Sequence, residues 1–139
     1  MKPCNLSIVD MFDYVQVEGG KGSPTLPLLI FRKGMKNSAR TLAIIDTGLD
    51  EALLLSKEIR DILFVESGPP DTHESLWAGV VEIPCEVYTV SVKILDKWWR
   101  VNAYAPIYNG YENLIGKLLL NTVNLCLRGP TRKACISKG

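Results

Sequence analysis

Residues 42–48 read Leu-Ala-Ile-Ile-Asp-Thr-Gly, an apolar run that ends in an acid, a hydroxyl residue and a glycine. The apolar part is typical of the end of a buried β-strand. A strand that ends in this way places Asp46 at the rim of the core, partly buried and facing a cleft. The tripeptide alone is a weak signal, because it also fits an ordinary turn in which Asp accepts backbone N–H groups and Gly takes a positive φ. Both interpretations stay open at this point.

The sequence on both sides of this stretch predicts a mostly β domain. Turn signals recur at short intervals, and the runs between them are rich in Val, Ile, Leu, Tyr and Trp. Pro24 and Pro27 favour an edge position or a strand start for the second run, and Asp96-Lys97 is a candidate two-residue turn. The expected strands are 8–17, 25–31, 39–45, most of 76–104, 123–127 and 133–136.

Two segments change to helical spacing. Apolar residues recur every three to four positions in 50–63, which predicts one or two helical turns with Asp50 as a cap. Residues 114–120 are typical of a strand end that turns into a short helix. The predicted fold class is therefore all-β with two short helices.

Composition limits the classes of function. The chain has 139 residues, a formal net charge of +1 and 47% hydrophobic residues, which predicts one domain over 1–139 with a substantial core. The near-neutral charge gives no reason to expect a nucleic acid or an acidic membrane as partner. No stretch is long enough to span a membrane. Asp10 and Asp13 interrupt the region where a signal peptide needs an apolar run, so we expect a cytoplasmic protein.

The cysteines do not predict a metal site. Cys4, Cys85, Cys126 and Cys135 form no Cys-x-x-Cys pair, and the single His73 lies far from all of them. Cys126 and Cys135 occupy two short apolar runs on either side of a turn at 128–131. They could therefore face each other across a hairpin, although a reducing compartment argues against a standing disulfide.

The order of motifs resembles the retropepsin-like aspartic proteases. The chain has a strand ending in Asp46-Thr47-Gly48, then a glycine-containing strand pair at 76–92, then the apolar-apolar-glycine run Leu114-Ile115-Gly116 before a Leu-rich segment. The likeness covers roughly residues 26–136 and is closest to single-domain microbial members. It implies an acid-protease β-barrel that works as a homodimer.

The resemblance also implies a mechanism. Asp46 of each subunit would be catalytic, because the chemistry needs two carboxylates that share one proton, and this chain supplies one such Asp. Thr47, Gly48 and Gly116 would support the catalytic loop. The substrate would be a peptide or protein, and no metal or organic cofactor is expected, because water is the nucleophile.

Other features leave alternatives open. A flap hairpin that turns near Trp77-Ala78-Gly79 would cover an extended substrate, although an ordinary surface hairpin fits as well. Leu49 follows the Asp-Thr-Gly where relatives usually carry Ala or Ser, and the flap is poor in glycine. A retropepsin-shaped dimer that binds peptides or a protein without cutting them is therefore the alternative, and an unrelated β-barrel module is the third. Residues 1–22 could be an N-terminal extension, an interface strand or simply the first strand.

Overall fold

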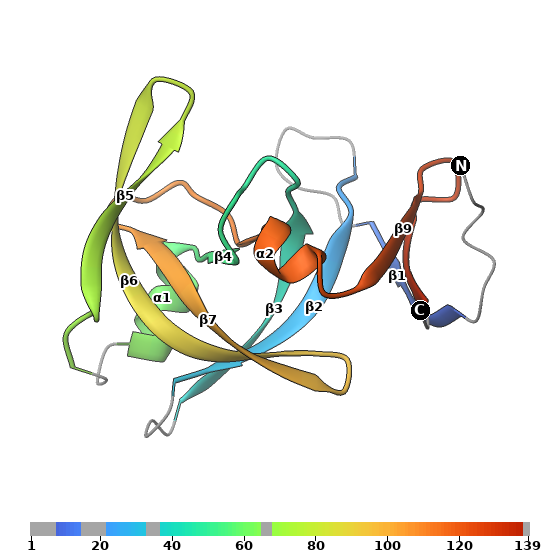
Figure 1. The fold of residues 1–139 in the computed structure, drawn as a ribbon, viewed down its shortest axis with the longest axis horizontal. Helices are drawn as coiled ribbons and strands as arrows, with labels where there is room; N and C mark the ends of the chain where they lie inside the picture. The colour runs from blue at the N-terminus through green and yellow to red at the C-terminus, as the bar shows by residue number, and fades with distance from the viewer. Residues whose placement is uncertain (1–7, 15–21, 33–36, 65–67, 138–139) are drawn as a thin grey trace.

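A computed structural model describes residues 8–14, 22–32, 37–64 and 68–137. Within these ranges the chain is mostly β-strand with two short helices (Figure 1). The predicted all-β class is therefore confirmed. The strands are β1 (Ile8–Asp13), β2 (Thr25–Phe31), β3 (Ser38–Ile45), β4 (Leu53–Leu54), β5 (Thr72–Ala78), β6 (Val81–Ile94), β7 (Lys97–Pro106), β8 (Leu114–Ile115), β9 (Asn124–Arg128) and β10 (Lys133–Ser137).

The larger sheet closes into a barrel. Its strand order is β2-β3-β8-β4-β7-β6-β5, and β2 also pairs with β6. This second pairing joins the strands from β2 to β6 into a ring, which leaves no open edge among them. The sequence favoured an edge position or a strand start for the prolines of β2. Residues 29–31 have a partner strand on each side, so β2 is not an edge strand, and Pro24 and Pro27 lie at and near its start. Pro27, which has no N–H to donate, lies in the part of β2 that pairs only with β3.

Alternation along the strands fills the barrel. β2 buries Leu26, Leu28 and Ile30, and β3 buries Ala43 and Ile45 in the same cluster. The side chains between them point to the other face of each strand. Asp46 follows β3 directly, so the alternation places its side chain on the outer face of the strand rather than in the barrel core.

A smaller sheet packs beside the barrel, with strand order β1-β10-β9. Ala134 and Ile136 of β10 belong to the barrel's apolar cluster. In this sheet Cys126 lies directly opposite Cys135 across the β9–β10 hairpin, an arrangement that the sequence left open. Part of the 1–22 segment forms β1, while residues 1–7 and 15–21 lie outside the described residues, so the role of this segment stays a prediction.

The first helix begins later than the sequence predicted. Helix α1 spans Lys57–Phe64, and the Ser56 hydroxyl, rather than Asp50, caps it by accepting the Ile59 N–H at 3.3 Å. The preceding leucines are extended instead, because Leu53 and Leu54 pair with β7 on one side and β8 on the other. Pairing with distant strands thus overrides the local helical spacing.

The second helix, α2, spans Lys117–Leu120 directly after β8, within the segment for which the sequence predicted a short helix. In the described ranges no helix has the length and apolar character that crossing a membrane requires.

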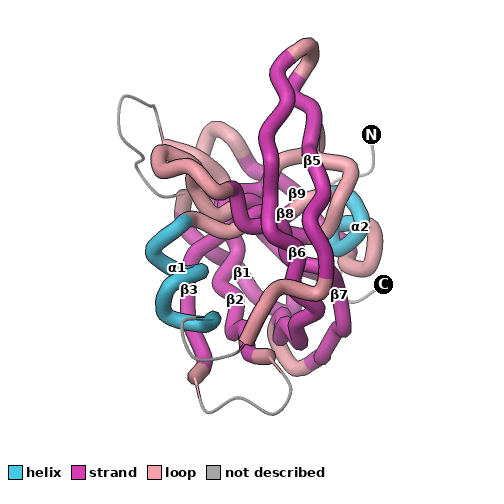
Figure 2. Tube along the Cα trace, turned by 90° about the vertical axis from the view of Figure 1, so that its left-hand side faces the viewer, coloured by secondary structure: helices cyan, strands magenta, loops and turns pink. Residues whose placement is uncertain are grey.

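The β5–β6 hairpin projects from the barrel, as Figures 1 and 2 show. Ala78 pairs with Val81, so the turn consists of Gly79 and Val80, one residue beyond the stretch that the sequence indicated. Gly79 has φ 63°, which a glycine adopts without strain. Positive φ at the first turn residue only is the pattern of a type II′ hairpin turn, which matches the twist of the strands.

The β6–β7 turn also differs by one position from the prediction. Ile94 pairs with Lys97, so Leu95 and Asp96 form the turn instead of Asp96 and Lys97. Leu95 has φ 56°, an uncommon conformation for a branched side chain. Because leucine is unfavourable at a turn position with positive φ, the sequence alone pointed to Asp96 and Lys97 as the turn.

Candidate active site at the end of β3

Asp46 is fixed by the backbone around it. Its N–H donates to the Ile115 carbonyl at 3.0 Å, and its own carbonyl accepts the Leu49 N–H at 3.2 Å. Its carboxylate oxygen Oδ1 accepts the Gly48 N–H at 2.8 Å. The side chain is half-buried. A carboxylate held in this way keeps one orientation at the rim of the barrel.

The next two residues complete a tight loop. Gly48 does not adopt a positive φ, so the ordinary-turn interpretation explains the Asp46 hydrogen bond but not the glycine. The lack of room for a side chain explains the glycine better, because a Cβ at this position would lie 3.2 Å from Asp46 Oδ1. Thr47 is exposed beside it.

Strand β8 passes directly beneath this loop. It pairs in parallel with the end of β3, with Ile45 beside Ile115, and antiparallel with β4 on its other side. The Gly116 N–H then donates to the Ala52 carbonyl and the Lys117 N–H to the Leu49 carbonyl, each at 2.8 Å. The crossing strand therefore holds both ends of the Asp46 loop.

Gly116 lies at the tightest point of the crossing. A Cβ there would lie 2.1 Å from the Glu51 carbonyl oxygen and 2.7 Å from that of Leu49, both of which are backbone atoms. Only glycine fits this position. The structure thus places Asp46, Thr47, Gly48 and Gly116 in one loop-and-strand unit, and their catalytic roles stay a prediction.

An ion pair that the sequence did not indicate lies beside this loop. Lys117 Nζ lies 2.6 Å from Asp50 Oδ1. About half of the lysine side chain and most of the aspartate are exposed, so water and salt screen the pair and its effect on stability is small. No local sequence pattern predicts this contact, because Asp50 precedes β4 and Lys117 follows β8, far away in the chain.

Asn113 is a second residue that the sequence did not single out. Its side-chain oxygen accepts the Ser56 N–H at 2.8 Å, and its amide nitrogen donates to Thr41 Oγ1 at 3.1 Å. Its backbone carbonyl accepts the Ile44 N–H at 2.8 Å. Asn113 therefore ties β3 to the start of α1 immediately before β8 enters the sheet.

The two faces of the β5–β6 hairpin differ in character. Leu76 and Ile83 lie opposite each other and pack with Tyr104 in a small apolar cluster. Trp77 lies opposite Glu82 on the other face and is 66% exposed. The apolar face continues towards the tip through Ala78, whereas the Trp77 ring lies on the side away from the cluster. The substrate-binding role predicted for Trp77, Ala78 and Gly79 stays a prediction.

Burial of this cluster perturbs its polar groups. Tyr104 donates a hydrogen bond to Glu74 Oε2 at 3.0 Å. Burial, reinforced by the Glu74 carboxylate, raises the pKa of Tyr104 well above its ordinary value. Burial also raises the pKa of the Cys85 thiol to about 11, which keeps that thiol protonated and unreactive near neutral pH.

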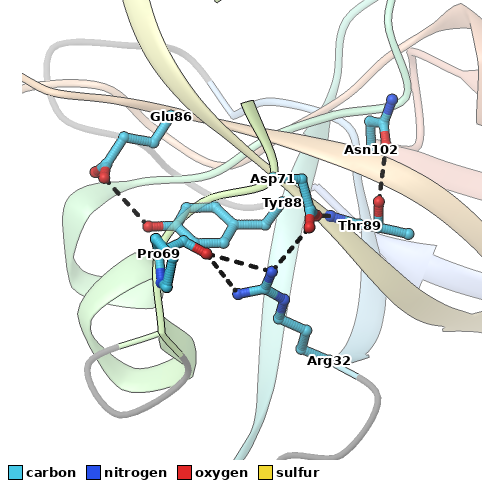
Figure 3. Close-up of polar contacts among 7 residues, drawn as sticks. All are labelled: Arg32, Pro69, Asp71, Glu86, Tyr88, Thr89 and Asn102. Carbon is cyan, nitrogen blue, oxygen red and sulfur yellow. Dashed lines mark hydrogen bonds and ion pairs between the residues drawn. The ribbon is translucent and has the colours of Figure 1, made fainter. Parts of the chain in front are cut away.

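A polar network holds the base of the hairpin, as Figure 3 shows. Asp71, directly before β5, accepts the Thr89 N–H at 2.6 Å through Oδ2 and pairs with Arg32 Nη2 at 3.1 Å through Oδ1. The Arg32 guanidinium also contacts the Pro69 carbonyl and lies over the Tyr88 ring, 5.1 Å from its centre. The base of the hairpin is thus fastened to β2 and β6, while its tip projects.

This network predicts an acid-dependent loss of stability. The Thr89 N–H first, and then the Arg32 charge, lower the pKa of Asp71 against the opposing effect of burial. A lowered folded-state pKa stabilises the protein above the unfolded value of 3.8, and this contribution is lost as the pH falls through the folded-state pKa. Because nearly half of the side chain is exposed, the effect is modest.

We expect Asp71→Asn to flatten the fall in the free energy of unfolding below about pH 4. Denaturant unfolding at a series of acidic pH values measures this. Asp96→Asn, which neutralises an exposed carboxylate in the β6–β7 turn, is the control. Equal pH profiles for wild type and Asp71→Asn would contradict the assignment.

A wide recess lies away from the predicted site residues. It has a volume of about 920 Å³ and is lined by residues of β1, β2, β3 and the β6–β7 turn, such as Phe12, Leu28 and Leu95. Across the described ranges, no three His, Cys, Asp or Glu side chains gather closely enough to share a metal ion.

Comparison with known proteins gives structural matches only. No protein-family model and no curated protein sequence matches the chain. The fold is similar to that of EIAV protease, solved in complex with the inhibitor HBY-793, with a TM-score of 0.57 and 16% identity over 78% of this chain and 93% of that chain. It is also similar to a retropepsin-like aspartic protease from Rickettsia conorii, with a TM-score of 0.54 and 14% identity over 91% of this chain and 89% of that chain.

Both likenesses extend over most of each chain. At these identities the matches establish architecture rather than activity. We conclude that this protein has the fold of the retropepsin-like aspartic proteases.

Proposed function

We propose that the protein is an aspartic endopeptidase that hydrolyses peptide bonds as a homodimer. One observation carries the proposal: a half-buried Asp46 carboxylate, fixed by the Gly48 N–H, stands over a strand crossing that only Gly116 permits. The two solved structures that share this fold are described as proteases. The sequence motif, the local geometry and the fold therefore support the same activity.

The chemistry requires two chains. Two carboxylates about 3 Å apart cannot both ionise, so they share one proton, and this pair activates water. One chain supplies one Asp46, and a two-fold axis beside it would supply the second. Thr47 supports this arrangement, because its hydroxyl is exposed and has no hydrogen-bond partner among the described residues. In the dimer it would bond to the backbone of the partner subunit's loop.

Each proton has a defined path in this mechanism. The ionised carboxylate takes a proton from water, and the water oxygen attacks the peptide carbonyl carbon. The protonated carboxyl gives its proton to the carbonyl oxygen. When the tetrahedral intermediate collapses, the C–N bond breaks and the leaving nitrogen takes the proton that the first carboxylate received from water. One hydroxyl of the intermediate gives its proton to the other carboxylate, so the product is a carboxylic acid and the dyad regains its single shared proton. Two Asp46 carboxyls and water complete this reaction without a cofactor.

The β5–β6 hairpin would cover the substrate. Peptides that bind in extended form add backbone hydrogen bonds to a neighbouring strand. The hairpin projects as a two-stranded arm whose base is fastened through Asp71 and whose tip turns at Gly79. This arrangement supports movement at the tip rather than at the base.

A second candidate function is a dimer that binds extended peptides or a protein partner without cutting them. The observation that favours it is Leu49, an apolar residue directly after Gly48 that cannot hydrogen-bond the carboxylate. A transition-state-analogue inhibitor of aspartic proteases separates the two functions, because tight binding of such a compound needs a working dyad. An increase in melting temperature supports the protease, and no increase from a folded dimer supports the binding protein.

We expect cleavage activity per chain to rise with protein concentration until the dimer is fully formed. A site made of two chains is active only in the dimer, so activity should follow the dimer fraction measured by analytical ultracentrifugation. A peptide mixture incubated between about pH 3 and 7 provides the substrates. Constant activity per chain across concentrations at which the protein is a monomer would contradict the two-chain site.

A further inference from the structure

A small pocket of about 260 Å³ lies beside the Asp46 strand. We call it the Ile44 pocket. It is built from the start of β2, the outer face of β3, the start of α1 and the segment before β8. Its lining residues include Thr25, Leu42, Ile44, Glu58, Glu112 and Asn113.

The strand register places this pocket next to the candidate dyad. Leu42, Ile44 and Asp46 alternate along one strand, so their side chains lie on the same face, opposite the buried Ala43 and Ile45. Thr25 lies directly across from Ile44 on β2 and shares this face. Two residues of strand span about 7 Å, so the pocket begins within one or two substrate residues of the Asp46 carboxylate.

One residue that lines the pocket carries a buried polar atom without a partner. Thr25 is 2% exposed, and its Oγ1 forms no hydrogen bond within the described part of the chain. An unpaired buried hydroxyl is costly, which points to a donor or acceptor that the pocket is built to receive. Ile44 and Leu42 supply an apolar wall beside it.

The pocket is also acidic. Glu58 and Glu112 both line it, and neither forms an ion pair with any Lys or Arg in the described ranges. Asn113, the amide between them, is already bonded to Ser56 and Thr41. An apolar wall with carboxylates at its rim suits a side chain that has an aliphatic stem and a positive end.

We propose that the Ile44 pocket is the subsite that selects a lysine or arginine side chain of the substrate, with Glu112 as its main charged partner. The aliphatic stem lies along Leu42 and Ile44, the cationic end donates to the carboxylates, and Thr25 Oγ1 accepts a further N–H. This inference deepens the proposed protease function and rests on it. It predicts a basic residue at one position close to the cleaved bond.

The first test is the sequence preference of cleavage. A peptide mixture that contains internal Lys and Arg is digested and the cleaved bonds are identified by mass spectrometry. We expect Lys and Arg to be enriched at one position with the wild type, and Glu112→Gln to reduce that enrichment about tenfold, as the loss of a charge-assisted hydrogen bond implies. Glu112→Lys should favour Asp and Glu there instead, while Asp96→Asn, the matched control, keeps the wild-type preference.

The second test does not depend on cleavage. Acetyl-arginine methylamide and its neutral isostere acetyl-citrulline methylamide are titrated against the full chain, and the amide NMR signals of Thr25, Ile44 and Asn113 are followed. We expect shifts with the arginine probe only, and their loss in Glu112→Gln.

The outcomes separate the two proposals. Arginine-specific shifts without any Asp46-dependent cleavage would overturn the protease and support the pocket. Asp46-dependent cleavage without a basic preference, or equal shifts with both probes, would overturn the basic subsite.

Discussion

Asp46→Asn abolishes peptide-bond cleavage while leaving the fold and the dimer intact: this is the largest effect on activity that we expect. An asparagine amide neither takes a proton from water nor gives one to the carbonyl oxygen. General acid–base catalysis contributes about 10²–10⁴-fold for each group, and the substitution removes both members of the dyad at once. We therefore expect the rate to fall by at least about 10⁴-fold.

Stability should respond differently from activity. Asn keeps an oxygen that can accept the Gly48 N–H, so the local hydrogen bond survives. Two neutral amides at a dimer interface also replace two crowded carboxyls, so the melting temperature should be equal or higher. Cleavage of the peptide mixture, melting temperature and sedimentation are measured together.

The matched control is Asp50→Asn, four residues along the same loop, whose carboxylate is 83% exposed. It removes the same charge but no catalytic group, so cleavage should continue. If Asp46→Asn retains wild-type cleavage, or if Asp50→Asn loses activity to the same extent, Asp46 is not the catalytic carboxylate.

The largest effect on stability is expected for Gly116→Ala. One methyl group would lie 2.1 Å from the Glu51 carbonyl oxygen and 2.7 Å from the Leu49 carbonyl oxygen. The Leu49 carbonyl cannot move without breaking its hydrogen bond from the Lys117 N–H, and Glu51 is tied in place by its neighbour Ala52, whose carbonyl accepts the Gly116 N–H. Overpacking a dense region costs about 1–3 kcal/mol, and a clash with rigid backbone lies at or above the top of that range.

Denaturant unfolding measures the loss, with Gly129→Ala as the control. Gly129 lies in the β9–β10 turn, does not have a positive φ, and a Cβ there would meet no atom within 4 Å. The control should therefore unfold close to the wild-type midpoint. A Gly116→Ala protein as stable as the Gly129→Ala protein would show that β8 does not cross beneath the Asp46 loop as described.

The sequence predicts those features of the site that are formed by residues adjacent in the chain. Asp46, Thr47 and Gly48 are adjacent, and the strand before them is identifiable from its apolar run, so the end of that strand was predicted correctly. The position of Gly116 beneath this loop was implied by the family resemblance of its apolar-apolar-glycine run. Its physical reason, the approach of the Glu51 carbonyl, is visible only in three dimensions.

The rest depends on pairings between distant residues. Leu53 and Leu54 satisfy helical spacing and strand spacing equally, and only β7 and β8 decide in favour of a strand. The Ile44 pocket draws its lining from four separate segments, so neither Thr25 nor Glu112 stands out in the sequence. The role of Asn113 has the same origin, since each of its partners lies more than fifty residues away in the chain.

The strand crossing beneath Asp46 also has a consequence for how the protein folds. Asn113 and Thr41, which lie at its entrance, are 72 residues apart in the chain, so β8 takes its place only after a long loop has closed. Topologies dominated by such distant pairings fold slowly. The Asp46 loop has its backbone hydrogen bonds to Ile115 and Lys117 only when β8 is in place. The position of the Asp46 loop on the barrel is therefore set by one of the most distant pairings in the chain.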